Sequence, residues 1–221
     1  MNDPLLVLEP GRLISPASHY PLAENRGARL IRTTKPGGIE WLRDMLPYQF
    51  LKVPYALPIT SLQTYEHGSW QTWMVDEAAH WIMTLSAAEK IKGPKVCVAG
   101  LGLGLIAHAL ATRTDITHVV IVERNPSVIE LMRPLLPQTK VPRFITYQDD
   151  FWKFVRYWGQ GDFQTFFVDL WRGSIHDHRE EVLAKRHLLE SKHPWPGTES
   201  LFFAFQTLID FARLEEGLTH A

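Results

Sequence analysis

The sequence has 221 residues, of which 45% are hydrophobic and 21% are charged, and this composition excludes an intrinsically disordered chain. Its 23 Lys and Arg residues nearly balance 24 Asp and Glu residues, so a formal net charge of -1 excludes nucleic-acid binding through bulk charge. The apolar run at residues 5–8 is too short for a signal peptide and no stretch approaches the roughly 18 apolar residues of a membrane helix, so we expect a cytoplasmic protein without membrane contact.

The first third of the chain, residues 1–75, is predicted to form a small lobe that contains β-structure. It is rich in Pro and Gly, with one short helix expected over residues 39–46, where Pro47 would end it. The dipeptide His67-Gly68 separates two β-prone segments and predicts a hairpin. The β-prone segments of this lobe are 50–53, 61–65 and 70–75.

From Asp76 the apolar residues recur with a period near 3.6, which predicts a helix over residues 76–90. Short β-prone runs then alternate with helical stretches. The predicted strands are 95–99, 119–122, 143–147, 165–168 and 201–205, and the predicted helices are 105–110, 126–133, 151–158 and 177–192. This alternation is typical of a parallel sheet covered on both faces. We predict an α/β fold over residues 76–221, with a doubly wound, mostly parallel, Rossmann-like sheet.

Gly100, Gly102 and Gly104 lie where the first of these strands passes into a helix, so the chain must turn tightly and a ligand can approach its backbone. Glu123 follows the second strand, 19 residues after Gly104, where a carboxylate can accept hydrogen bonds from both ribose hydroxyls. A packing turn at the glycines, and an ion pair of Glu123 with Arg124, are alternative interpretations. Since G-x-G-x-G lacks the third glycine position of G-x-G-x-x-G, a nicotinamide cofactor is the weaker nucleoside choice.

Three further carboxylates are expected at the same edge of the sheet. Asp149 and Asp150 follow the third strand, and Asp169 ends the fourth. Ligands of open α/β sheets bind at this edge. One of the first two could accept a hydrogen bond from an adenine amino group, although Asp150 is equally suited to cap the helix that begins at Phe151. Asp169 would face the reactive end of the ligand, or else cap the following turn.

These motifs resemble those of the class I S-adenosylmethionine-dependent methyltransferase superfamily. The resemblance covers about residues 60–170 and rests on the segment 96–104 together with Glu123, Asp149 and Asp169. Within the superfamily they look most like the spermidine synthase branch, in which an apolar residue stands at the position of Val98. The segment 68–71, followed by Asp76-Glu77 and a helix, is similar to the hairpin and helix that precede the nucleotide fold in that branch.

The resemblance implies a cofactor, S-adenosylmethionine or its decarboxylated form, bound over the backbone of residues 100–104. It places Gln71 at the methionine side of the ligand, Glu123 at the ribose and Asp149 at the adenine. It also implies that Asp169, which matches the first acidic residue of the catalytic motif of that branch, acts as a general base on an attacking amine.

One residue departs from the pattern of that branch. Arg172 stands where those synthases carry a second acidic residue, which holds the polyamine, and a guanidinium would repel such a substrate. Methyl transfer to a small-molecule acceptor is therefore the favoured function. Aminopropyl transfer and a catalytically inactive nucleotide-binding or interaction protein are the alternatives. Residues 206–221 are too few for the additional hairpin common in methyltransferase sheets, so we also expect self-association.

The remaining candidate residues give weaker signals. Trp152, Trp158 and Trp171 could line a pocket for a flat acceptor or pack together in the core. His176-Asp177-His178 offers three potential metal ligands in a row, but adjacent side chains do not all point to one ion, so no metal site is predicted.

Overall fold

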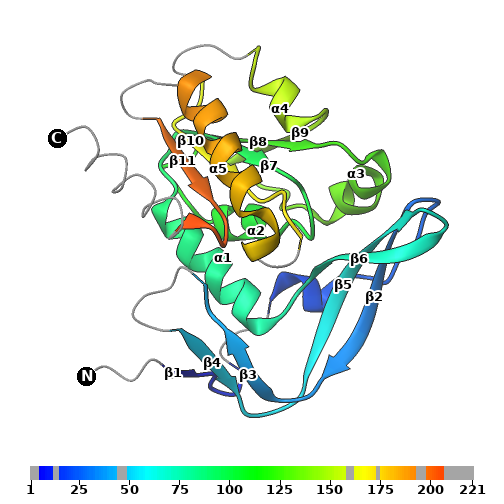
Figure 1. Cartoon of the computed structure of the whole chain (residues 1–221). Helices are drawn as coiled ribbons and strands as arrows, with labels where there is room; N and C mark the ends of the chain where they lie inside the picture. The colour runs from blue at the N-terminus through cyan, green and yellow to red at the C-terminus, as the bar shows by residue number, and fades with distance from the viewer. Residues whose placement is uncertain are drawn as a thin grey trace.

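The structure of the protein, a computed structural model, describes residues 5–11, 15–43, 49–157, 162–172, 175–192 and 198–206. The side chains of residues 175–177 and 192 are outside that description. Within these ranges five parallel strands form a central sheet in the order β11-β10-β7-β8-β9 (Figure 1). The strands are β7 (Lys95–Ala99), β8 (His118–Glu123), β9 (Arg143–Gln148), β10 (Thr165–Val168) and β11 (Glu199–Phe202).

The order of these strands confirms the predicted doubly wound topology. The chain first adds β8 and β9 on one side of β7, then returns to place β10 and β11 on the other. Such a reversal creates a crevice at the carboxyl ends of the two strands where the order changes, here β7 and β10.

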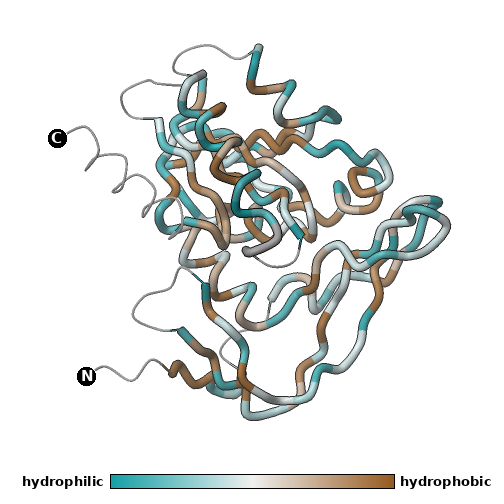
Figure 2. Tube along the Cα trace, in the orientation of Figure 1, coloured by the Kyte–Doolittle hydropathy of each residue, from teal (hydrophilic) through white to brown (hydrophobic). Residues whose placement is uncertain are grey.

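Helices cover both faces of the sheet, because alternate residues of each strand point to opposite sides. Val96 and Val98 of β7 join the core beneath the first three helices, whereas Cys97 and Ala99 join the core beneath the other two. Figure 2 shows hydrophobic residues along the strands of this sheet. The helices are α1 (Ala78–Lys90), α2 (Leu105–Leu110), α3 (Pro126–Met132), followed by the 3₁₀ helix η2 (Arg133–Leu135), α4 (Phe151–Phe154) and α5 (Ile175–Lys192).

The N-terminal lobe is built from two small sheets, each with three strands in the described part of the chain. The predicted hairpin is present, with His67 and Gly68 both at positive φ in the turn between two antiparallel strands. The first sheet contains β2 (Ala28–Lys35), β5 (Leu57–Glu66) and β6 (Ser69–Val75). The second contains β1 (Leu5–Val7), β4 (Phe50–Val53) and β3 (Gly38–Trp41), and a 3₁₀ helix, η1, spans Pro16–His19.

The helix predicted over residues 39–46 is wrong. Residues 38–41 form β3, which pairs antiparallel with β4, and residues 44–46 lie outside the described part of the chain. The reason is long-range: Glu40 points inward, where it accepts a hydrogen bond from the Ala79 backbone N–H at 2.8 Å. Ile39 and Trp41, with 68% and 64% of their surfaces exposed, point outward. This alternation suits a strand and not a helix.

Other boundaries differ by a few residues from the predicted ones. The helix predicted over residues 151–158 is assigned only at Phe151–Phe154, and Trp158 falls outside the described residues. The last strand begins at Glu199, earlier than predicted, and strands β1 and β2 were not predicted. None of the helices in the described ranges is long and apolar enough to cross a membrane.

Candidate functional site

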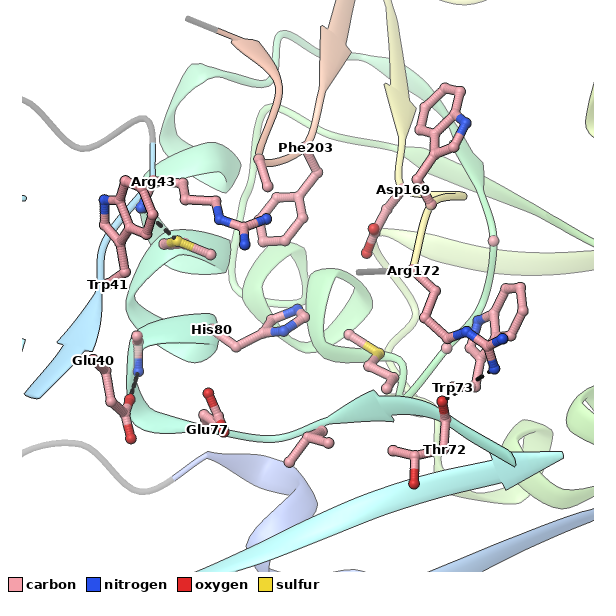
Figure 3. A pocket seen from close by; sticks show the side chains of 18 of the residues that line it. Glu40, Trp41, Arg43, Thr72, Trp73, Glu77, His80, Asp169, Arg172 and Phe203 are labelled. Carbon is pink, nitrogen blue, oxygen red and sulfur yellow. Dashed lines mark hydrogen bonds between the residues drawn. The ribbon is translucent and has the colours of Figure 1, made fainter. Parts of the chain in front are cut away.

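Two of the molecule's cavities meet at the carboxyl edge of the sheet, at the crevice between β7 and β10. The first, the sheet-edge cavity, has a volume of about 500 Å³ and includes Glu123, Asp149 and Asp150. The second, the lobe cavity, has a volume of about 610 Å³ and reaches from this edge to the N-terminal lobe (Figure 3). Both fall within the size range of small-molecule sites. The residues shared by both linings are Trp73, Gly100, Asp169, Leu170, Trp171 and Arg172.

The glycine turn after β7 lies beneath both cavities. Gly100 has φ 88°, and a Cβ there would come within 2.6 Å of the backbone oxygen of Asp169. A Cβ on Gly102, at φ 48°, would meet the sulfur of Met74 at 2.6 Å. The absence of side chains therefore lets the end of β10 and the N-terminal lobe approach the turn closely.

Because the packing at Gly100 is this close, adding a single methyl group there is expected to destabilise the protein. Gly100→Ala is expected to lower the free energy of unfolding by about 1–3 kcal/mol, because the substitution combines a positive φ with a backbone clash. At this chain length that corresponds to a fall in Tm of roughly 2–12 °C, measurable by thermal unfolding. Gly38→Ala is the matched control, since a Cβ at Gly38 would have no neighbour within 4 Å. Equal shifts in the two variants would contradict the packing argument.

The carboxylate of Glu123 connects the glycine turn to the end of β8. Glu123 is only 9% exposed, and its carboxylate accepts hydrogen bonds from the backbone N–H groups of Leu101 at 2.9 Å and Asn125 at 2.8 Å. The described residues show no ion pair between Glu123 and Arg124, whose guanidinium instead lies 5.9 Å from the ring centre of Trp73. Glu123 is thus held in place by backbone donors at the wall of the sheet-edge cavity.

Asp149 and Asp150 both line the sheet-edge cavity, as the sequence predicts, and both also make local hydrogen bonds. Asp150 caps α4, because its Oδ1 accepts from the backbone N–H of Lys153 at 3.0 Å. Asp149 Oδ1 accepts from the backbone N–H of Asp150 at 2.8 Å. The capping interpretation of Asp150 is therefore confirmed.

Asp169 lies at the junction of the two cavities, where its backbone N–H donates to the carbonyl of Ala99 at 3.2 Å. Figure 3 shows its carboxylate pointing into the lobe cavity. Burial raises the pKa of this carboxyl from 3.8 to about 7. A carboxyl with a pKa near neutrality can both accept and release a proton under ordinary conditions.

Arg172 lines both cavities, as predicted, but other groups partly engage its guanidinium. Its Nη1 donates to the carbonyl oxygen of Thr72 at 3.3 Å, and its guanidinium lies 5.6 Å from the ring centre of Trp73. The neighbouring Trp171 also lines both cavities, and it packs on Phe202 with the rings stacked at 6.0 Å. Trp171 therefore both packs against Phe202 and forms part of the wall of the two cavities.

One predicted site residue, Gln71, lies apart from the other predicted site residues. Gln71 lies outside the described lining of both cavities, and its Nε2 donates to Ser69 Oγ at 2.7 Å. Two residues later the pairing of β5 and β6 shifts register, so that Trp73 has no partner across the strands. A β-bulge of this kind redirects a side chain. Trp73 enters both cavities in place of Gln71.

Sequence reasoning also missed two cavity residues from the lobe side, Met74 and His80. Met74 Sδ accepts a hydrogen bond from the backbone N–H of Leu103 at 3.2 Å, within the glycine turn. His80, on α1, has a buried Nε2 without a hydrogen-bond partner among the described residues, and its ring centre lies 5.2 Å from that of Phe203. Burial, with a smaller contribution from Arg43, lowers the pKa of His80 to about 4, so this imidazole is neutral near pH 7. The period of α1 identifies only its core face, which is why His80 gave no signal.

The tract at residues 176–178 is only partly described. The side chains of His176 and Asp177 lie outside the described residues. His178 Nε2 lies 2.7 Å from the carbonyl oxygen of Arg172, next to the sheet-edge cavity. The absence of a metal site stays a prediction.

Comparisons with known proteins give no sequence relative: no protein-family model and no curated protein matches this chain. Solved structures with a similar arrangement include a methyltransferase from Geobacter sulfurreducens, with 24% identity over 50% of this chain and 55% of that chain and a TM-score of 0.35. A dimethyladenosine transferase from Plasmodium falciparum has 15% identity over 47% and 35%, with a TM-score of 0.34. A spermidine synthase in complex with the transition-state analogue AdoDATO has 19% identity over 52% and 43%, with a TM-score of 0.36.

The chain spans between 35% and 55% of the length of these three structures, and at these TM-scores the alignments assign no activity to it. The fold is established by the chain's own elements. Its parallel sheet, in the order β11-β10-β7-β8-β9 with a glycine turn after β7, has a doubly wound, Rossmann-like architecture.

Proposed function

We propose that this protein is an S-adenosylmethionine-dependent transferase that moves a methyl group to a small-molecule acceptor. The observation that carries the proposal is Glu123, a buried carboxylate fixed against the glycine turn in one cavity with Asp149 and Asp169. Carboxylates at the ends of β8 and β9 suit the hydroxyl and amino donors of an adenosine.

The residues of the sheet-edge cavity fit such a cofactor in volume and in hydrogen-bonding groups. Glu123 would hold the ribose, Asp149 the adenine amino group, and the backbone at Gly100 would lie beneath the ligand. When bound, S-adenosylmethionine supplies an already activated methyl group, so the protein has mainly to align donor and acceptor. Asp169, which lies at the junction with the lobe cavity, would accept the proton that the attacking group of the acceptor loses.

Titration calorimetry with three related compounds tests the proposal before any acceptor is known. S-adenosylmethionine, its decarboxylated form and methylthioadenosine share the thioadenosine part and differ in the remainder. Binding of S-adenosylmethionine is the expected result. If none of the three binds, the proposed function is wrong and the third alternative, an interaction protein, gains support.

Aminopropyl transfer is the second candidate, and Arg172 distinguishes it from methyl transfer. We expect no transfer when the unmodified protein is assayed with putrescine and decarboxylated S-adenosylmethionine, because a guanidinium stays charged at any accessible pH and would repel the amine. Any activity should appear only in Arg172→Asp. Arg143→Asp, which makes the same charge change at the opposite end of the sheet, serves as the control. Robust transfer by the unmodified protein would reverse the ranking of the two reactions.

Several wider properties remain predictions from the sequence. These are location in the cytoplasm, self-association, the lack of nucleic-acid binding through bulk charge, and a boundary near residue 75 between the lobe and the nucleotide-binding domain.

A further inference from the structure

The distribution of charge along the lobe cavity is uneven. At the end near α1, Lys35 Nζ lies 2.9 Å from a carboxylate oxygen of Glu40 and 2.8 Å from one of Glu77, so these two acids share a cation. At the other end, beside Asp169, Arg172 contacts a neutral carbonyl and an indole ring and has no carboxylate partner among the described residues. Within the described chain, the guanidinium at the junction of the two cavities is therefore not neutralised by an ion pair.

Aromatic side chains form one part of the lining of the lobe cavity. Trp73 and Trp171 stand at the junction, and Phe203 lies next to His80 further inside (Figure 3). Flat rings on a cavity wall favour flat ligands, which can stack or make edge contacts with them.

His80 supplies a second, independent sign of a ligand. Its Nε2 is buried without a partner among the described residues, an uncommon condition for a polar side-chain atom. His80 and Asp169 extend into the cavity from opposite sides, one from α1 and one from the end of β10 (Figure 3). A polar group on a bound molecule would provide the hydrogen bond that His80 lacks.

We propose that the acceptor is an aromatic oxyanion, a carboxylate or a phosphate ester, whose anionic group binds Arg172 while its ring lies against the aromatic wall of the lobe cavity. This inference rests on the proposed function and adds the chemical class of its substrate. The planar guanidinium can donate two parallel hydrogen bonds to either kind of oxyanion. The anion would thereby hold the acceptor beside Asp169.

The test uses the full chain and matched aromatic probes measured by calorimetry. The probes are 4-hydroxybenzoate, its neutral amide 4-hydroxybenzamide, the cationic 4-hydroxybenzylamine, the ester 4-hydroxyphenyl phosphate and the non-aromatic acid cyclohexanecarboxylate. We expect at least one of the two aromatic anions to bind ten times or more tightly than the amide and the amine. The tighter of the two anions then identifies the carboxylate or the phosphate class.

Two variants assign the effect to Arg172. Arg172→Gln should weaken binding of the preferred anion at least tenfold, while a glutamine can still donate to Thr72. Arg143→Gln removes an exposed guanidinium at the opposite end of the sheet and should change the affinity less than twofold.

Several results would overturn the inference. These are amide or amine binding as tight as that of the anions, no probe binding at all, or unchanged anion affinity in Arg172→Gln. Equal binding of cyclohexanecarboxylate would overturn the aromatic part. Failure of the proposed function is seen separately, as the lack of any binding by S-adenosylmethionine, its decarboxylated form and methylthioadenosine.

Discussion

The variant Asp169→Asn is expected to lose about 10²–10⁴-fold in the rate of group transfer, the usual contribution of a positioned general base. The amide keeps the shape of the side chain at the junction of the two cavities but cannot accept a proton. The measurement is single-turnover methyl transfer to an acceptor, with S-adenosylmethionine binding followed by calorimetry as a parallel readout. A variant that retains full rate would show that Asp169 only caps the turn after β10.

The same substitution has a second readout that needs no acceptor. Because burial raises the pKa of Asp169 to about 7, the folded protein keeps this proton at pH values where the unfolded chain, with a pKa near 3.8, has released it. Ionisation of Asp169 in the unfolded chain therefore lowers the free energy of unfolding as the pH rises from about 4 to 7. The free energy of unfolding stays lower above pH 7. Asp169→Asn lacks this cost.

Thermal unfolding at two pH values checks the sign of this effect. The difference in Tm between Asp169→Asn and the unmodified protein should be more positive at pH 8 than at pH 4. Asp76, whose pKa burial raises to about 6, is present in both proteins and contributes equally to each. A Tm difference that is the same at both pH values would contradict the buried position of the carboxyl group.

Glu123→Ala is expected to weaken binding of S-adenosylmethionine by about 1.5–3 kcal/mol, the range for hydrogen bonds to a charged group. This corresponds to a loss of roughly 10- to 150-fold in affinity, measured by calorimetry. The variant removes the proposed ribose acceptor and leaves the backbone N–H groups of Leu101 and Asn125 without the carboxylate.

Two further variants separate these contributions. Glu123→Gln keeps one acceptor oxygen and should lose less affinity than the alanine variant. Glu89→Ala removes an exposed carboxylate from α1 and should leave binding unchanged. Unchanged affinity in Glu123→Ala would rule out the assignment of this residue to the ribose.

The central sheet was predictable because its signals are local. Buried strands such as 95–99 and 119–122 are short apolar runs, and the turn between strand and helix is marked by glycines at alternate positions. The carboxyl ends of parallel strands meet at one edge, so Glu123, Asp149 and Asp169 could be grouped from their order along the chain.

The lobe was predicted less well because its structure depends on contacts between distant segments. Strand β3 forms at residues 38–41 because Glu40 reaches the start of α1 and the strand pairs with β4, and neither contact is visible in the local sequence. The bulge in β6 had a similar effect on the site. Gln71 was predicted from the resemblance alone, and the local sequence does not locate the residue at which the register shifts, so Trp73 was not predicted.

Trp73 connects the two cavities, so that binding in one can affect binding in the other. Its indole belongs to the lobe and forms part of the wall of both cavities, with the guanidinium groups of Arg124 and Arg172 within 6 Å of its ring centre. A molecule that moves this ring while entering one cavity alters the surface offered to the second molecule. Thermodynamic linkage then requires that the effect be reciprocal. The donor changes the affinity for the acceptor by the same factor by which the acceptor changes the affinity for the donor.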